Sequence, residues 1–155
     1  MTVTVSSGST VSAPEDPSKE TDEAYTYTFA GWEGYDPEMR IDKDYVFTAV
    51  FDKTLREYLI EYYSENSLFF EDMRPYGSPL GMTWVPEKDS DIQYDYAFVG
   101  WNTEKDGTGA WYDPTSAVSG PLTLYAVFDR TPIEYCVSIY VDGEEASCSN
   151  CVYGD

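Results

Sequence analysis

Tyr27-Thr28-Phe29-Ala30-Gly31-Trp32 is followed later in the chain by a second version of itself, Tyr96-Ala97-Phe98-Val99-Gly100-Trp101. Each copy precedes a Tyr-Asp-Pro sequence (35–37 and 112–114) and then an Ala-Val-Phe-Asp sequence (49–52 and 126–129). Internal copies indicate a small array of similar modules. Such duplicated β modules are more often spacers or binding surfaces than catalysts, so the repeat favours a non-enzymatic role.

The spacing of the copies locates an insertion and sets the module boundaries. Gly31 and Gly100 lie 69 positions apart, whereas Phe51 and Phe128 lie 77 apart. The eight extra residues, 102–109, have the composition of an exposed loop. We therefore predict the C-terminal part of a first repeat (1–54), a complete second repeat (55–131) and the N-terminal hairpin of a third (132–155). Boundaries inside repeats favour a piece of a longer protein.

The complete copy contains five motifs in a fixed order: Tyr76-Gly77-Ser78, Pro86-Glu87-Lys88, Tyr96 to Trp101, Asp106-Gly107-Thr108-Gly109 and Leu122 to Phe128. In this order the motifs resemble the Listeria–Bacteroides repeat, also called the internalin-type B repeat, of bacterial surface proteins. The resemblance implies a β-grasp-like sheet of about four strands in an extracellular protein. The first copy departs from the pattern because it lacks the leading hairpin and shortens the Gly-rich loop to Glu33-Gly34.

Alternation of apolar and polar residues predicts which strand residues face inward. Tyr58, Ile60 and Tyr62 should share an inward face, and so should their equivalents in the third copy, Tyr135, Val137 and Ile139. The glycine before each repeated Trp should let the backbone pass close to the ring. The predicted structural core consists of Phe29, Trp32, Phe51, Phe98, Trp101, Leu124 and Phe128.

The predicted fold class is mostly β. Aromatic residues make up 17% of the chain, with 15 Tyr, a strand-favouring residue. Prolines interrupt the connections, so we expect at most one short helix or helical turn in each module, near residues 114–118. Together with the resemblance, this gives an α+β, β-grasp-like arrangement of tandem modules with small antiparallel or mixed sheets.

Charge excludes several classes of partner. The chain has 29 acidic residues, 9 basic residues and no His, for a net charge of −20. This charge argues against binding to nucleic acid or to anionic lipid. No hydrophobic run approaches the length of a membrane span, and the first residues do not form a secretion signal. We predict an extracellular, cell-surface location, with a virion surface as the alternative.

The candidates for chemistry are few. Without His, the usual catalytic triads and most zinc sites are unavailable. Calcium prefers carboxylate-rich loops, and such groups occur at Asp89, Asp91, Asp95 and Asp106. Their spacing matches no known calcium motif, so a solvated acidic loop is the preferred interpretation. We predict no catalytic residue, no metal ligand and no cofactor.

The three cysteines, Cys136, Cys148 and Cys151, all lie in the third copy. The Cys148-x-x-Cys151 pair has the spacing of a redox or zinc motif, but a zinc site would need further ligands that the chain lacks. A hairpin that turns at Asp142-Gly143 would bring Cys136 near the other two. We therefore predict a cross-strand disulfide from Cys136 to either Cys148 or Cys151.

The sequence predicts a non-enzymatic repeat segment that acts as a stalk, spacer or adhesive module. Its expected partners are proteins or glycans at a surface. Residues 133–155 form a hairpin without the remainder of its module, and residues 2–53 form a half-module without a leading hairpin. We therefore expect self-association, in which one hairpin completes a neighbour's half-module. A virion decoration or fibre protein and a carbohydrate-binding module stay open as alternatives.

Overall fold

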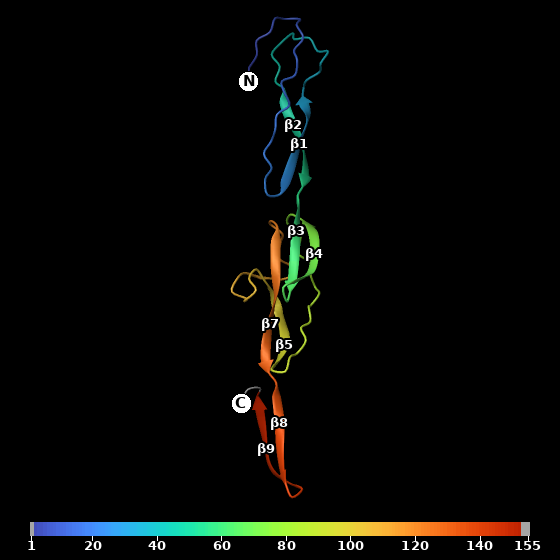
Figure 1. Ribbon diagram of the computed structural model, residues 1–155. Coiled ribbons are helices and arrows are strands. Elements are labelled where there is room, and N and C mark those ends of the chain that lie inside the picture. The colour runs from blue at the N-terminus through green and yellow to red at the C-terminus, as the bar shows by residue number, and fades with distance from the viewer. Residues whose placement is uncertain (1, 153–155) are drawn as a thin grey trace. The chain divides into compact units, whose positions relative to one another are not determined.

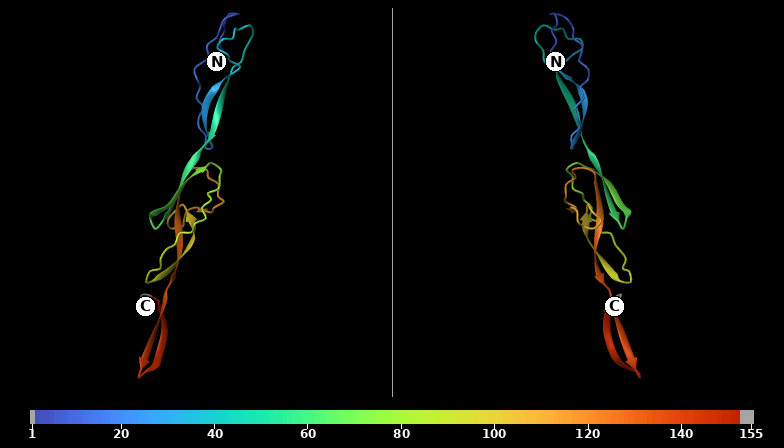
Figure 2. Two further views of the ribbon diagram at one scale, coloured as in Figure 1. Left: turned by 90° about the vertical axis from the view of Figure 1, so that its right-hand side faces the viewer. Right: turned by 60° about the vertical axis from the view of Figure 1, so that its left-hand side comes forward.

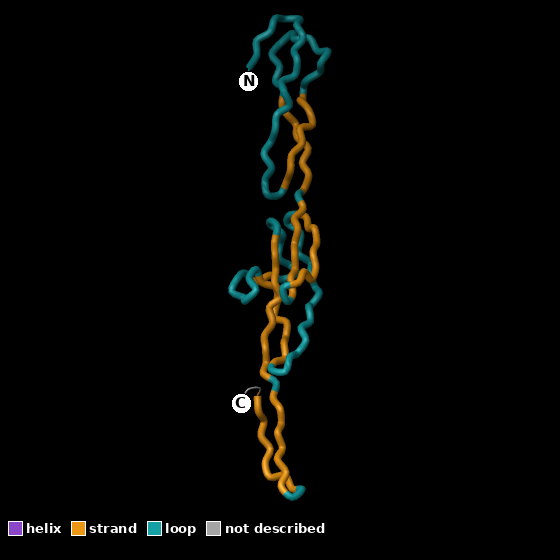
Figure 3. The backbone as a smooth tube through the Cα atoms, in the orientation of Figure 1, coloured by secondary structure: helices purple, strands orange, loops and turns teal. Residues whose placement is uncertain are grey.

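The computed structural model describes the backbone of residues 2–152 and the side chains as far as Glu144. The chain forms two compact units, unit 1 (Met1–Glu57) and unit 2 (Tyr58–Asp155). The described residues contain strands, turns and loops but no helix (Figure 3). The prediction of a mostly β protein is thus confirmed, whereas no α component is seen in the described range. The described part also has no helix that could cross a membrane.

Unit 1 is built on a single antiparallel pair. Strand β1 (Tyr25–Glu33) pairs with β2 (Thr48–Leu55), and the register shifts at a bulge between Phe29 and Gly31. The preceding residues fold back on the connection between these strands. The amide of Gly8 donates to the carbonyl of Ile41 at 2.7 Å, and the amide of Ile41 donates to the carbonyl of Ser9 at 2.9 Å.

Unit 2 contains a five-stranded mixed sheet (Figure 1). Its strands are β3 (Glu57–Ser64), β4 (Ser67–Pro75), β5 (Tyr94–Asn102), β6 (Trp111–Tyr112) and β7 (Leu122–Pro132). Their spatial order is β4-β3-β7-β5-β6. The start of β7, from Leu122 to Tyr125, pairs parallel with β3, and the remainder, from Tyr125 to Pro132, pairs antiparallel with β5. Strand β7 therefore joins the leading hairpin of the repeat to its second half.

The two units repeat the same hydrogen-bonding pattern at equivalent positions. The β5–β7 register shifts between Phe98 and Gly100, as β1–β2 does one repeat earlier. The amide of Gly77 donates to the carbonyl of Val118 at 2.7 Å, and the amide of Val118 donates to the carbonyl of Ser78 at 2.9 Å. These bonds reproduce the Gly8, Ser9 and Ile41 bonds of unit 1. The 69- and 77-residue offsets of the sequence are therefore structural equivalences.

A second hairpin follows the sheet of unit 2 and is seen from two further directions in Figure 2. It consists of β8 (Glu134–Val141) and β9 (Glu144–Val152), joined by a turn at Asp142 and Gly143. Both turn residues have positive φ, 52° and 84°. Two such residues are what a tight two-residue hairpin turn requires, and the Asp-Gly pair that we predicted as the turn supplies them. The turn of the β3–β4 hairpin uses Glu65 and Asn66 in the same way, at φ 50° and 69°.

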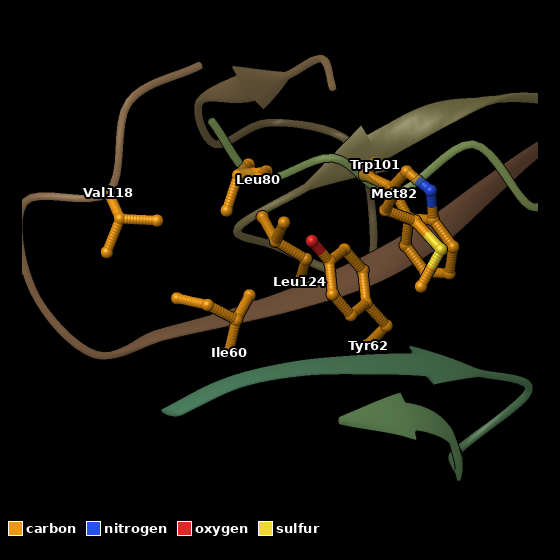
Figure 4. Close-up of a cluster of buried hydrophobic side chains, with 7 residues drawn as sticks. All are labelled: Ile60, Tyr62, Leu80, Met82, Trp101, Val118 and Leu124. Carbon is orange, nitrogen blue, oxygen red and sulfur yellow. The ribbon is translucent and has the colours of Figure 1, made fainter. Parts of the chain in front are cut away.

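The hydrophobic core of unit 2 lies between β3, β7, β5 and the loops that cover them (Figure 4). Ile60 and Leu124 have no exposed surface, and Tyr62 is 2% exposed. Their neighbours on adjacent strands and loops complete the cluster: Leu80, Met82, Trp101 and Val118. The inward orientation predicted for Ile60 and Tyr62 is confirmed, and Tyr58 packs against the same cluster.

The predicted inward face of the third copy is exposed in the described structure. Tyr135 is 46% exposed, Val137 50% and Ile139 53%. The alternation itself is the same as in β3, but within the described residues no second layer packs on β8. The prediction of buried side chains at these three positions is therefore wrong for this chain.

One local prediction concerned the segment 114–118, where at most a short helix or helical turn was expected. The segment forms a turn in which the Thr115 amide donates to Asp113 Oδ1 at 2.7 Å, followed by an isolated bridge between Pro79 and Ala117. Capping of the backbone by Asp113 competes with helix formation here. A Cβ at Gly100 would sit 3.3 Å from the ring of Trp111, so this glycine lets the backbone pass close to that ring, and the expected closeness to the ring of Trp101 stays a prediction.

A candidate binding groove on unit 2

The side chains of Lys88, Asp91 and Tyr96 form a cluster at the start of β5, and two of them, Lys88 and Tyr96, line a groove. Asp91 accepts hydrogen bonds at Oδ1 from the amides of Gln93 (2.7 Å) and Tyr94 (2.8 Å). Its Oδ2 accepts from the hydroxyl of Tyr96 at 2.7 Å. The Nζ of Lys88 lies 4.0 Å from the centre of the Tyr96 ring, a cation–π contact. The Asp91 carboxylate therefore connects the first residues of β5 to the Tyr96 ring, on which Lys88 packs.

The hydrogen bond between Asp91 and Tyr96 shifts the pKa values of both side chains. The Tyr96 hydroxyl first, and then the Gln93 and Tyr94 amides, lower the pKa of the Asp91 carboxyl below its usual value of 3.8. The same bond raises the pKa of Tyr96 above its usual value of 10.0. Both shifts have the same physical cause: the pair is most stable with an ionised carboxylate and a protonated phenol.

Unit 1 contains the same cluster one repeat earlier. Asp22 Oδ1 accepts from the amides of Ala24 (2.9 Å) and Tyr25 (2.7 Å), and its Oδ2 accepts from the Tyr27 hydroxyl at 2.7 Å. The Nζ of Lys19 lies 3.7 Å from the centre of the Tyr27 ring. The cluster is therefore part of the repeat itself and belongs to the fold of each unit.

Three of the four acidic residues considered for calcium accept hydrogen bonds from residues close to them in the sequence. Asp91 accepts the hydrogen bonds from Gln93, Tyr94 and Tyr96 described above. Asp95 Oδ1 accepts from the Ser90 hydroxyl. Asp106 Oδ1 accepts from the amide of Thr108 at 3.0 Å and from its hydroxyl. The described residues contain no group of three acidic or cysteine side chains placed to hold a metal ion. Carboxylates that cap turns in this way are structural.

In unit 2 the cluster opens into a groove of about 340 Å³. Four segments line it: the end of β3 with the β3–β4 turn, the Lys88 and Tyr96 pair, the loop at Lys105 and Asp106, and the middle of β7 from Tyr125 to Phe128. The volume is at the lower end of the range of about 300–1,000 Å³ that is typical of small-ligand sites.

The aromatic part of the groove comes from two neighbouring parallel strands. The rings of Tyr63 on β3 and Tyr125 on β7 lie 5.8 Å apart between centroids, at 36° to one another. Tyr63 donates its hydroxyl to Glu61 Oε1 at 3.3 Å. The charge of Glu61 is the main cause that raises the pKa of Tyr63. Both rings are half-buried, so each keeps part of its surface open.

Two lysines lie at the groove, and each has an acceptor on the β3–β4 turn. The Nζ of Lys88 is 3.3 Å from Glu65 Oε1, and the Nζ of Lys105 donates to Asn66 Oδ1 at 2.7 Å. Lys105 also lies 5.2 Å from the centre of the Tyr125 ring. These contacts connect the leading hairpin to the later parts of the repeat. A groove of this composition therefore requires a complete repeat.

The loop that carries Lys105 is held by a buried amide. Asn102 has no exposed surface. Its Nδ2 donates to the carbonyls of Gly107 (3.2 Å) and Gly109 (3.1 Å), and its Oδ1 accepts from the amide of Glu104 at 2.9 Å. A glycine is needed at position 109 because a Cβ there would collide with Thr103 Oγ1 and would sit 2.8 Å from Asn102 Oδ1. Asn102 thus positions the loop without lining the groove.

The residues predicted as structural core lie in both units. In unit 2, Trp101 is 6% exposed and Leu124 is fully buried, Phe98 packs against them, and Phe128 lies at the groove. Their equivalents form the same edge-to-face pairs in unit 1. The ring centroids of Phe29 and Trp32 are 5.6 Å apart and those of Phe29 and Phe51 are 5.8 Å apart. The matching distances in unit 2 are 5.5 Å for Phe98 and Trp101 and 5.8 Å for Phe98 and Phe128.

The cysteine prediction falls partly outside the described residues. The backbone register of β8 and β9 places Asn150 opposite Cys136, Cys148 opposite Ser138, and Cys151 opposite Tyr135. The side chains of Cys148 and Cys151 lie outside the described range. The disulfide therefore stays a prediction.

Sequence reasoning missed the groove residues Lys88 and Lys105, and it missed Asn102, which holds the loop that carries Lys105. One signal was available: Lys19-x-x-Asp22 recurs 69 positions later as Lys88-x-x-Asp91. A charged pair that recurs beside a repeated aromatic strand indicates a structural cluster. No equivalent signal exists for Lys105, because its loop occurs in one copy only.

Comparison with known proteins also finds a repeat domain in unit 2. Residues 83–127 match the model of the Listeria-Bacteroides repeat domain. This chain contains a repeat of that family. The matched span includes Lys88, Tyr96, Lys105 and Tyr125, so most of the groove lies within the Listeria–Bacteroides repeat, while the β3–β4 hairpin precedes it.

Two similar proteins come from Evansella cellulosilytica. One, named "Putative Gly-rich membrane protein", is 30% identical over 124 residues, covering 66% of this chain and 14% of that protein. The other, named "Putative membrane protein", is 30% identical over 132 residues, covering 77% of this chain and 19% of that protein. The chain thus spans less than a fifth of the length of either relative. No solved structure matches the chain.

Proposed function

We propose that this chain is a non-enzymatic repeat segment of an extracellular surface protein, where it acts as a spacer built from repeats that join by hairpin addition. The family match and the two relatives named as membrane proteins support the surface setting. The duplicated turn carboxylates support a structural role, because they serve the fold in both units.

One observation carries the joining mechanism. Equivalent residues are buried on β3 and exposed on β8. Ile60 is 0% and Tyr62 2% exposed, whereas Val137 and Ile139 at the equivalent positions are 50% and 53% exposed. Uncovered apolar side chains on a two-stranded hairpin are unfavourable in water, and a hairpin alone is marginally stable. The β8–β9 hairpin is therefore suited to docking on another half-repeat.

Unit 1 offers the complementary surface. In unit 2, Leu122 to Tyr125 are strand and pair parallel with Ile60 to Tyr63. The equivalent residues of unit 1 are 45–48; the first three of them are loop, and Tyr45 is 36% and Val46 85% exposed. In the part of the chain that the structure describes, no parallel strand equivalent to β3 lies beside them. Transfer of the β3–β7 register predicts that Val137 pairs with Tyr45 and Ile139 with Phe47 of a second copy.

Sedimentation velocity over a range of chain concentrations tests this proposal. We expect association that is lost on deletion of residues 133–155 and in the double variant Val137→Thr, Ile139→Thr, since Thr keeps strand propensity but removes apolar surface. The control Tyr140→Thr changes the next residue, on the opposite face of the same strand. A well-folded monomer both before and after the deletion would show that hairpin addition does not occur.

A further inference from the structure

We infer that the groove of unit 2 binds a neutral glycan. This binding activity is separate from the spacer role and does not depend on hairpin addition. The inference rests on the composition of the groove, on its charge balance and on its restriction to the complete repeat.

The aromatic rings supply the apolar contact that a sugar ring needs. Tyr63, Tyr96 and Tyr125 line the groove and are half-buried, so their rings are fixed by packing but still accessible. A pyranose presents C–H groups on its faces and hydroxyls around its rim. Tyr rings offer a rigid apolar surface with a polar end, which suits this distribution.

The polar groups supply donors and acceptors around those rings. Lys88 and Lys105 are donors, Glu65 and Asp106 are acceptors, and Asn66 is both. Lys88 and Glu65 keep 28% and 54% of their side-chain surfaces exposed, so their mutual contact leaves capacity for a ligand. Sugar hydroxyls are at once donors and acceptors, and they can enter such a network without leaving a buried charge unpaired.

Charge decides between a neutral and an acidic glycan. The groove has two cationic and two anionic side chains, so its lining is balanced. The rest of the chain contributes the whole of the net charge of −20. An acidic polysaccharide would have to displace Glu65 from Lys88 and approach this negative field, which is screened only beyond about 8 Å at physiological salt. A neutral glycan meets neither obstacle.

Unit 1 shows what the groove needs beyond the repeated cluster. It has Lys19, Tyr27 and Asp22 in the same arrangement. It has Thr48 where unit 2 has Tyr125, and the eight-residue loop that carries Lys105 is missing from its sequence. Lys19 is therefore a matched control for Lys88, and Tyr125→Thr introduces the residue that the first copy carries at this position.

The experiment is an NMR titration of the 155-residue chain with mannohexaose, cellohexaose and xylohexaose, each in a separate sample. We expect saturable shifts of groove resonances with at least one of them. Tyr125→Thr, Lys88→Gln and Lys105→Gln should each weaken that binding about tenfold or more, as expected on losing a good contact. Lys19→Gln should bind as the unchanged chain does.

Several results would overturn the inference. These are the absence of saturable binding to all three sugars, binding that the groove variants leave unchanged, and binding to oligogalacturonate with none to the neutral sugars. Lys105 lies in an exposed loop, so Lys105→Gln decides the matter even if Tyr125→Thr perturbs folding. Amide spectra of each variant without sugar report whether the fold is kept.

Discussion

At the scale of single residues, the same aromatic pairs end up with different burial. Trp32 and Trp101 make edge-to-face contacts of nearly equal distance with their Phe partners. Trp101 is nevertheless almost fully buried, while Trp32 is half-buried. The difference arises because Tyr62 of the leading hairpin packs on Trp101 with ring centroids 5.0 Å apart. The burial of each Trp therefore depends on the presence of a hairpin.

Replacement of Trp101 by Ala should lower the free energy of unfolding of unit 2 by about 3–5 kcal/mol, because a large buried side chain is lost and a cavity remains. Urea unfolding followed by circular dichroism measures this loss. The control is Trp84→Ala, whose side chain is 62% exposed and should cost clearly less. An unchanged unfolding midpoint for Trp101→Ala, combined with lost sugar binding, would make Trp101 a binding residue and not a core residue.

Asp91 should give the chain an acid-dependent stability. Its hydrogen bonds to Tyr96, Gln93 and Tyr94 lower its pKa in the folded state. A lowered folded-state pKa contributes stability that is present above the unfolded-state pKa and is lost as the pH falls through the folded-state value. Asp91→Asn should therefore flatten the fall of the urea midpoint below the usual Asp pKa of 3.8. Asp89→Asn, which removes an exposed charge two residues away, should keep that fall, and equal pH profiles for the two variants would contradict the prediction.

At the scale of elements, the sequence was sufficient to predict strands and one turn. It was not sufficient to predict which strands and side chains pair with one another. Alternation identified the buried face of β3, and Asp142-Gly143 identified the β8–β9 turn, because both signals are local. The parallel pairing of Ile60 with Leu122 and the contact of Lys105 with Asn66 join residues far apart in sequence. The alternation of apolar and polar residues along one strand does not indicate which distant segment that strand will contact. Residues 114–118, where at most a short helix or helical turn was expected, form a turn that Asp113 caps, which is also a local effect.

The loop 102–109 should depend on Asn102. Asn102→Ala removes three hydrogen bonds and leaves the partly buried carbonyls of Gly107 and Gly109 without this donor. We expect a loss of about 1–3 kcal/mol in the free energy of unfolding, the usual cost of unsatisfied buried polar groups. We also expect weaker sugar binding, because Lys105 would no longer be positioned. Thr108→Ala, on the exposed side of the same loop, is the control; a fully stable Asn102→Ala protein would contradict the role of Asn102.

The third-copy hairpin should contain one disulfide when the protein is made under oxidising conditions. We expect Cys136 to pair with Cys148 or Cys151, and a bridge across such a short loop should contribute about 2–3 kcal/mol at most. Mass spectrometry of peptides from unreduced, exported protein identifies the pair. Three unmodified thiols in that material would show that the hairpin is held by its backbone pairing alone.

At the scale of the whole molecule, the net charge of −20 acts against any contact between copies. Hairpin addition would bring two such chains together through apolar residues on β8 and the loop before β2. The attraction would be hydrophobic and short-ranged, whereas the repulsion is electrostatic and is screened by salt. The two contributions can therefore be separated by ionic strength.

Association through the β8–β9 hairpin should strengthen as salt is added. Between about 0.01 M and 0.15 M the screening length falls from about 30 Å to about 8 Å, so the repulsion between copies weakens while apolar contacts are kept. Sedimentation equilibrium at several NaCl concentrations should show a decreasing dissociation constant, and the Val137→Thr, Ile139→Thr variant should stay monomeric at every concentration. If added salt weakened the association instead, the contact would be one between opposite charges. The exposed face of β8 would then not be the surface that joins the repeats.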